Sequence, residues 1–119
     1  MDASEMARLR DMLIGMREEV AARSARIEAE LRELVGSRAD ANDDDEHDPE
    51  GVTLSAEWSR LAGLSTQATE ELDEVRQALE RWESGEYGIC TSCGNAIPFE
   101  RLEVRPFAAQ CVACASARR

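Results

Sequence analysis

Aromatic side chains, long apolar runs and lysine are all scarce in this sequence. Two tryptophans, one tyrosine and two phenylalanines are the only aromatic residues among 119, while 33% of the residues are charged. This balance favours elongated helices over a thick globular core. No stretch approaches the roughly 20 apolar residues of a membrane span, and the first residues lack the apolar core of a signal peptide. The sequence therefore predicts no membrane insertion and a cytoplasmic location.

Positive charge is also scarce, and all 14 basic residues are arginine. The net charge is −11, and it is unevenly distributed. Residues 1–84 carry 22 acidic and 10 basic side chains, whereas residues 85–119 carry 3 acidic and 4 basic ones. Because non-specific affinity for nucleic acid depends on Lys and Arg neutralising phosphates, we expect no direct DNA binding by the long acidic part.

A seven-residue apolar repeat runs through residues 5–35 and predicts a long helix with a coiled-coil seam. Arg23 and Glu30 interrupt its later part, where Leu31 is a flanking substitute. Asp2 and Glu5 have the spacing of an N-terminal capping box, and Gly36 is a plausible end of the helix. The apolar seam positions are Met6, Leu9, Leu13, Met16, Val20, Ile27 and Leu34.

A second repeat alternates steps of four and three residues and ends before Gly85, which supplies a stop. Its members are Leu54, Trp58, Leu61, Ser65, Ala68, Leu72, Val75, Leu79 and Trp82. Each helix would measure about 50 Å at about 1.5 Å per residue. Two helices of matched length joined by a short acidic loop predict an antiparallel hairpin within one chain, and hence a monomer. The expected fold is mainly α, with the hairpin over residues 1–84 and a tip at residues 38–52.

The loop between the repeats reads DDDEHDPEG, with six carboxylates and the only histidine, His47. Asp48 suits an N-cap, and Pro49 and Glu50 suit the first helical turn. A calcium loop is disfavoured because the EF-hand spacing is absent. A solvated connector and a functional tip both stay open, and in the functional interpretation Asp48 and Glu50 are the partner-binding residues.

All four cysteines lie near the C-terminus, in two C-x-x-C pairs separated by seventeen residues: Cys90, Cys93, Cys111 and Cys114. In a cytosolic chain this pattern indicates metal binding rather than disulfides. Four thiolates on two tight turns are typical of one structural Zn²⁺, and a redox dithiol or an iron–sulfur cluster is the alternative. Four protein ligands leave no open coordination position, so no catalysis is expected at this metal. No nucleophile–base pair is visible either, and we do not expect an enzyme.

Residues 85–119 would form a small zinc-finger module with the metal as its core. Between the two cysteine pairs, Arg101 and Arg105 stand beside Glu100 and Glu103. The plain interpretation is a surface helix turn that ends before Pro106. The functional interpretation makes the two arginines an anion contact or a docking face.

A hairpin followed by GEYGICTSCGNAIPFERLEVRP and CVACA resembles the DksA/TraR family of bacterial transcription regulators, over nearly the whole chain. The resemblance implies a protein that binds RNA polymerase without binding DNA. It implies that the hairpin enters the secondary channel and brings an acidic tip near the catalytic magnesium to modulate initiation, often together with guanosine tetraphosphate. The sequence resembles a shortened member of the family.

The resemblance also carries over to individual positions. The family's tip pattern, D-P-x-D-x-A, matches DPEGVT here, with Asp48 in agreement and Glu50 as the second carboxylate. The family's basic positions near the tetraphosphate fall on Arg105, Glu74 and Ala115, of which only the first is basic.

Two other functions fit the same sequence features. A Gre-like factor that assists transcript cleavage by the polymerase would also present carboxylates on a hairpin. A zinc-finger module for protein interaction, with the coiled coil as a dimerisation arm, is the other alternative.

Overall fold

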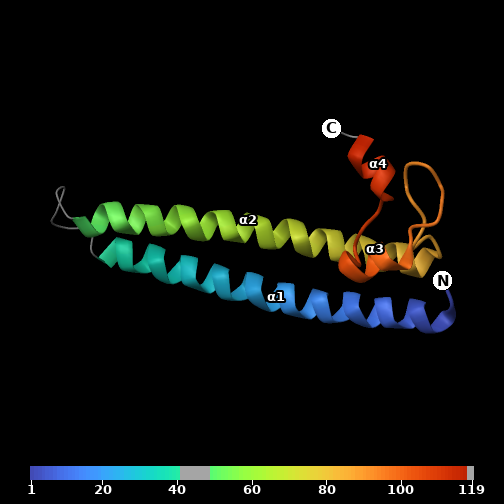
Figure 1. Ribbon diagram of the computed structural model, residues 1–119. Coiled ribbons are helices and arrows are strands. Elements are labelled where there is room, and N and C mark those ends of the chain that lie inside the picture. Colours follow the sequence, from blue (N-terminus) through green and yellow to red (C-terminus); the bar gives the residue numbers. More distant parts are fainter. Residues whose placement is uncertain (41–48, 118–119) are drawn as a thin grey trace. The chain divides into compact units, whose positions relative to one another are not determined.

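The structure of the chain is a computed structural model. It describes the backbone of residues 1–40 and 49–117 and the side-chain surroundings of residues 1–36 and 53–117. Four helices follow in order: α1 (Ala3–Asp40), α2 (Pro49–Ser84), α3 (Phe99–Val104) and α4 (Val112–Ala117) (Figure 1). The prediction of a mainly α fold with two long helices and a small four-cysteine module is confirmed. Within the described residues, no helix is long and apolar enough to cross a membrane.

The first turn of α1 is closed by the reciprocal hydrogen bonds of a capping box. The backbone N–H of Glu5 donates to Asp2 Oδ1 over 2.7 Å, and the backbone N–H of Asp2 donates to Glu5 Oε1 over 3.1 Å. These bonds satisfy two amides that have no partner inside the helix, as the spacing of the two residues predicts.

The other end of α1 differs from the prediction. The helix continues through Gly36 to Asp40. Gly36 does not have a positive φ, so it does not form the left-handed cap that was expected of it. A glycine inside a helix costs about 1 kcal/mol relative to alanine, which is too little to end a helix of this length.

The C-terminal end of α2 follows the prediction closely. Gly85 adopts φ +79° directly after the helix. Its N–H donates to the carbonyl oxygen of Trp82, and the N–H of Glu86 donates to that of Arg81, at 3.1 and 2.8 Å. These two bonds make a Schellman motif, which turns the chain sharply out of the helix and into the cysteine module.

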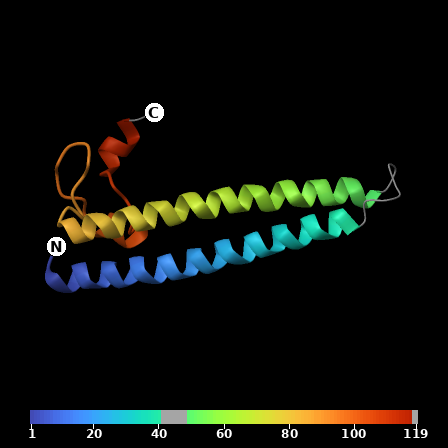
Figure 2. The same ribbon diagram turned by 180° about the vertical axis from the view of Figure 1, so that it is seen from behind.

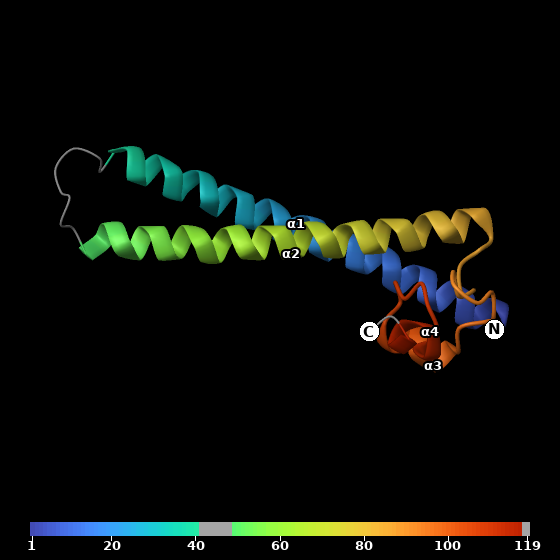
Figure 3. The same ribbon diagram turned by 90° about the horizontal axis from the view of Figure 1, so that it is seen from above.

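The described residues form two compact units, Met1–Glu19 with Leu72–Arg119 and, separately, Val20–Glu71. In the first unit, the N-terminal part of α1 runs antiparallel to the C-terminal part of α2, with the cysteine module packed beside them (Figures 2 and 3). One core joins all three parts. Its buried members are Leu9, Leu13, Val75, Ala78, Tyr87, Cys90, Ile97, Leu102 and Ala108.

The second unit, Val20–Glu71, has a thinner core. Ile27 of α1 and Leu61 and Ala68 of α2 are buried, and Leu31 and Leu34 pack against them. The unit therefore holds its two helix segments together mainly through one apolar seam.

One predicted interruption, Arg23, and one predicted seam residue, Trp58, have outcomes that the repeats do not show. Arg23, at an interior position of the first repeat, donates from Nη1 to Glu71 Oε2 over 3.2 Å, so a cross-helix ion pair replaces an apolar contact. Trp58 was expected in the seam of α2, but 46% of its side chain is exposed. The expectation was wrong because a straight helix drifts by about 20° per heptad relative to a strict seven-residue repeat.

Candidate metal centre and the basic pocket beside it

The first C-x-x-C pair lies on a tight loop with two left-handed glycines. Gly88 and Gly94 have φ of +84° and +76°. The N–H of Cys90 donates to the carbonyl oxygen of Asn95 over 2.8 Å, and the N–H of Gly94 donates to that of Cys90 over 2.9 Å. The glycines are required because L residues with a side chain rarely adopt such φ values. The loop thereby places both thiols of the pair on one side.

The second pair lies where α4 begins and is tied to the first loop. Thr91 donates from its backbone N–H and from Oγ1 to the carbonyl oxygen of Ala109, over 2.9 and 3.2 Å. Gln110 Nε2 donates to Ser92 Oγ over 2.6 Å. These bonds fix the two loops against each other, so that the two cysteine pairs face a common centre.

The ligand atoms of the four cysteines, Cys90, Cys93, Cys111 and Cys114, all lie within 4.8 Å of one another. Four thiolates at about 2.3 Å from a tetrahedral zinc would stand about 3.8 Å apart. The Sγ atoms of Cys93 and Cys111 are 3.9 Å apart. The sulfur set therefore fits a tetrahedral zinc ion.

The thiols differ in acidity. Backbone hydrogen bonds, first of all from Cys111, lower the pKa of Cys90 to about 6. Side-chain hydrogen bonds from the other thiols, first of all Cys111, raise the pKa of Cys114 to about 12. Because zinc binds thiolates, the metal must displace the proton that Cys114 retains near neutral pH.

A buried tyrosine anchors the metal module to the end of α2. The hydroxyl of Tyr87 donates to the carbonyl oxygen of Pro106 over 2.7 Å, and the ring lies 5.4 Å from that of Trp82. Burial raises the pKa of Tyr87 to about 12. Only 4% of Tyr87 is exposed, so its hydrogen bond links the start of the module to the segment before the second cysteine pair within the buried core.

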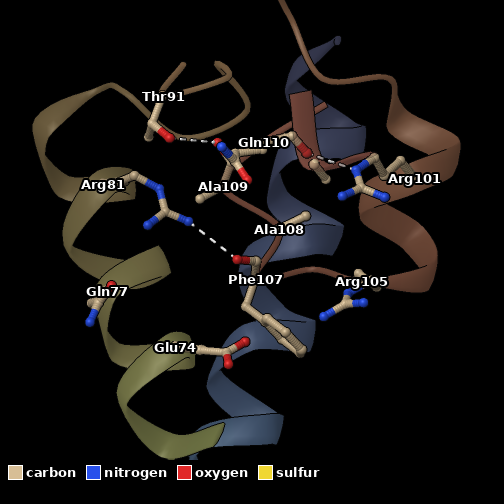
Figure 4. A pocket seen from close by; sticks show the side chains of 11 residues that line it. Glu74, Gln77, Arg81, Thr91, Arg101, Arg105, Phe107, Ala108, Ala109 and Gln110 are labelled. Atoms are coloured by element: carbon tan, nitrogen blue, oxygen red, sulfur yellow. Dashed lines mark hydrogen bonds between the residues drawn. The ribbon is translucent and has the colours of Figure 1, made fainter. Parts of the chain in front are cut away.

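Three arginines line a pocket of about 300 Å³ beside the metal centre: Arg81, Arg101 and Arg105. Figure 4 shows Arg81, Gln77 and Glu74 on α2 to one side, with Arg101 and Arg105 on the other. The resemblance carried the family's basic positions onto Arg105, Glu74 and Ala115, and these three residues do line the same pocket.

Two of the three arginines are held by backbone carbonyls. Arg101 Nε donates to the oxygen of Gln110 over 2.8 Å, and Arg81 Nη2 donates to that of Phe107 over 3.3 Å. The guanidinium of Arg105 lies over the Phe107 ring, 5.4 Å from its centroid. Burial lowers the pKa of Arg81, but a guanidinium stays protonated in proteins. The pocket thus offers positive charge, opposed by the carboxylate of Glu74.

Sequence reasoning missed Arg81 as a pocket residue. The available signal was its seven-residue separation from Glu74, which places both on one face of α2. Of the predicted tip residues, Asp48 lies outside the described residues. Glu50 lies in the first turn of α2, and its side chain is likewise outside the described part.

The hairpin and the four-thiolate set together define a class of protein: a zinc finger carried on paired long helices. Residues 85–119 match the family described as the prokaryotic dksA/traR C4-type zinc finger. The chain belongs to the DksA/TraR family, as the sequence motifs predict, and its cofactor is a structural zinc ion.

Relatives extend the similarity beyond the zinc finger. General stress protein 16O of Bacillus subtilis is 32% identical over 96 residues, which are 81% of this chain and 57% of that protein. The RNA polymerase-binding transcription factor DksA of Caulobacter vibrioides is 28% identical over 114 residues, 94% of this chain and 74% of the relative. The chain therefore spans a little over half of the Bacillus protein and about three quarters of the Caulobacter one.

A solved structure of a DksA protein is also similar to this chain. The transcription factor DksA2 from Pseudomonas aeruginosa has a TM-score of 0.81 and 27% identity to this chain. The similarity covers 98% of this chain and 84% of the other, so it includes the helices as well as the zinc finger.

Proposed function

We propose that this protein is a transcription regulator that binds RNA polymerase directly and has no catalytic site and no sequence-specific DNA contact of its own. The hairpin end, residues 38–52, enters the secondary channel and modulates initiation. The observation that supports this most is the similarity to DksA2 over 98% of the chain with a TM-score of 0.81. The Caulobacter relative, which is similar over 94% of this chain, is named an RNA polymerase-binding transcription factor, and this name supports the proposed partner.

The zinc ion has a structural role in this proposal. Cys90, Cys93, Cys111 and Cys114 are its ligands, and their thiolates fill a tetrahedral coordination sphere. No position is then left for a substrate or a reactive water. The metal instead holds the module against the end of α2, where the module closes the basic pocket.

Two carboxylates act at the hairpin end. α2 begins at Pro49, which places Glu50 in its first turn and Asp48 directly before it. Negative charge at a helix N-terminus is stabilised by the helix dipole. We assign the contact with the polymerase interior to these two residues.

The basic pocket is the second contact. Arg105 and Arg101 line it, and the guanidinium of Arg105 makes its described contact with the Phe107 ring rather than with a carboxylate. Its donors can therefore reach an anion, and guanosine tetraphosphate is the anion that the family resemblance suggests. Glu74 in the same pocket opposes such an anion, so we expect weak binding.

A pull-down of core RNA polymerase, followed by in vitro transcription, tests the main proposal. The double variant Asp48→Ala/Glu50→Ala should still bind the polymerase but should lose its effect on promoter output. The matched control is Asp43→Ala/Asp44→Ala, which removes the same charge from the same acidic stretch and should keep the effect. Equal output from the two variants and the wild type would rule out the tip mechanism, and shortened RNA in backtracked complexes would assign the protein to the cleavage factors.

The pocket is tested by titrating guanosine tetraphosphate into the complex with the polymerase. Arg105→Ala should weaken any response, whereas Arg76→Ala should not. Arg76 lies about 200° away from Glu74 around α2, on the face opposite the pocket. Its substitution by alanine removes the same charge as Arg105→Ala. A response that both variants reduce equally would mean that general charge, and not the pocket, is responsible.

A further inference from the structure

We propose that Trp58 of α2 and Val35 of α1 form a docking surface for a protein partner. The partner contributes an apolar pocket bordered by Lys or Arg side chains. The inference rests on the proposed function, in which that partner is the wall of the polymerase channel. Trp58 is 46% exposed and Val35 is 53% exposed. Both belong to the unit Val20–Glu71.

The two residues lie level with each other on the helix pair. The hydrogen bond between Arg23 and Glu71 shows that these two residues stand opposite each other on the antiparallel segments. Twelve residues further along α1 stands Val35, and thirteen residues back along α2 stands Trp58. Because both helices rise by about 1.5 Å per residue, the two positions lie at about the same level along the helix pair.

They also share one side of the pair. On α2, Leu61 and Ala68 face α1 and are buried. At about 100° per residue, Glu57 and Arg60 fall on one side of this buried line and Trp58 on the other. On α1, the same geometry around Ile27 and Leu34 separates Glu30 and Glu33 from Val35.

The two sides differ in chemistry. The charged side has a groove of about 300 Å³, lined by Glu30, Glu33, Leu34, Glu57, Arg60 and Leu61. The Glu57 carboxylate there accepts from Arg60 Nε and Nη2, at 3.0 and 2.6 Å. Around Trp58, by contrast, the α2 residues at helical spacing are small and uncharged: Ser55, Ala62, Ser65 and Thr69. On α2, Trp58 is therefore a large apolar side chain on an otherwise uncharged strip, while Glu28 lies on the same side of α1 as Val35.

The charge of the unit selects the partner. Residues 20–71 contain thirteen acidic and five basic side chains. This negative field repels a second copy of the chain and repels nucleic acid, and it attracts a surface rich in Lys and Arg. The stems of such residues pack against an indole and their charges interact with its face, which makes Trp a frequent anchor of protein interfaces.

The test measures the affinity of the full chain, labelled in the zinc finger, for core RNA polymerase. Trp58→Ala should raise Kd at least about tenfold, and the loss should persist at high salt because the contact is apolar. Leu64→Ala is the matched control: Leu64 is 37% exposed, lies on the same helix and faces the charged side, and its variant should stay within about twofold of wild type. Thermal unfolding of both variants should match wild type, because neither side chain is buried.

Three outcomes would overturn the proposed docking surface. Equal Kd values for the wild type, Trp58→Ala and Leu64→Ala would overturn the docking surface and leave polymerase binding intact. If the wild type itself does not bind, the proposed function fails and the docking surface fails with it. Sedimentation of the wild type as a dimer that Trp58→Ala converts to a monomer would assign the surface to self-association and would also overturn the proposal.

Discussion

Substituting Tyr87 by phenylalanine tests how the metal module is attached to α2. The change removes one oxygen, whose hydrogen bond to the carbonyl of Pro106 is 2.7 Å long and buried. It leaves a buried acceptor without its partner, which costs about 1–3 kcal/mol. We therefore expect Tyr87→Phe to lower the free energy of unfolding of the zinc-bound protein by about 2 kcal/mol. Chemical denaturation followed by far-ultraviolet circular dichroism measures it.

Thr91→Val is the matched control for Tyr87→Phe. The Thr91 hydroxyl donates to the carbonyl of Ala109 over 3.2 Å, but the Thr91 N–H already donates to the same oxygen over 2.9 Å, so the acceptor keeps a partner. The change should cost less than about 0.5 kcal/mol. Equal losses from the two variants would refute the reasoning, because the buried acceptor would then have no special weight.

The same tyrosine predicts a pH dependence with a defined sign. Burial raises the pKa of Tyr87 from 10.0 to about 12 in the folded protein. The neutral phenol is thus favoured by folding, and its contribution is fully present below pH 10 and is lost as the pH rises toward 12. The stability difference between wild type and Tyr87→Phe should shrink over this interval.

Tyr87 is the only tyrosine, so the ultraviolet absorbance of its phenolate reports this titration directly. The folded protein should titrate near 12 and the denatured chain near 10. A folded-state midpoint near 10 would contradict the burial of the hydroxyl.

Three further predictions concern the metal, a helix cap and an ion pair. Cys93→Ser, or a strong chelator, should cause the loss of one equivalent of zinc, measured in a colorimetric assay. The near-ultraviolet circular dichroism of the module should then disappear, because the metal supplies much of the module's folding energy. An intact spectrum would refute this. Asp2→Ala should cost about 1 kcal/mol in chemical denaturation, and Asp2→Asn, which keeps an acceptor, should cost less; equal losses would contradict the capping role. A double-mutant cycle on Arg23 and Glu71, whose side chains are 35% and 33% exposed, should give a coupling energy below about 1 kcal/mol, and a larger value would mean that the pair is far better shielded from water than its exposure indicates.

Much of the fold could be predicted because its determinants are local. The capping box needs only Asp2 and Glu5 three residues apart, and the end of α2 needs only a glycine at position 85. The cysteine spacing predicts a four-thiolate site for a similar reason, since each C-x-x-C turn brings two sulfurs together wherever the turn lies in the fold.

The features that were not predicted depend on tertiary packing. Trp58 sits at a seam position in the repeat, and only the accumulated rotation of the two helices moves it outward. The basic pocket combines residues of α2, α3 and the segment before α4, and no sequence pattern states that α3 docks beside Arg81. The hydrogen bond from Tyr87 to Pro106 spans nineteen residues and likewise follows from docking.

The first unit is built from two segments that are far apart in the sequence, and this affects the order of folding during synthesis on the ribosome. Met1–Glu19 shares its core with Leu72–Arg119, whereas Val20–Glu71 is a continuous stretch. The N-terminal segment of α1 therefore leaves the ribosome without its packing partners. Its core cannot form until Leu102 and the second cysteine pair have been made. The continuous unit can pair its helices earlier, because its contacts close a shorter stretch of chain. The four-thiolate site for zinc is accordingly completed only after Cys111 and Cys114 have been made, later than the residues that pair within Val20–Glu71.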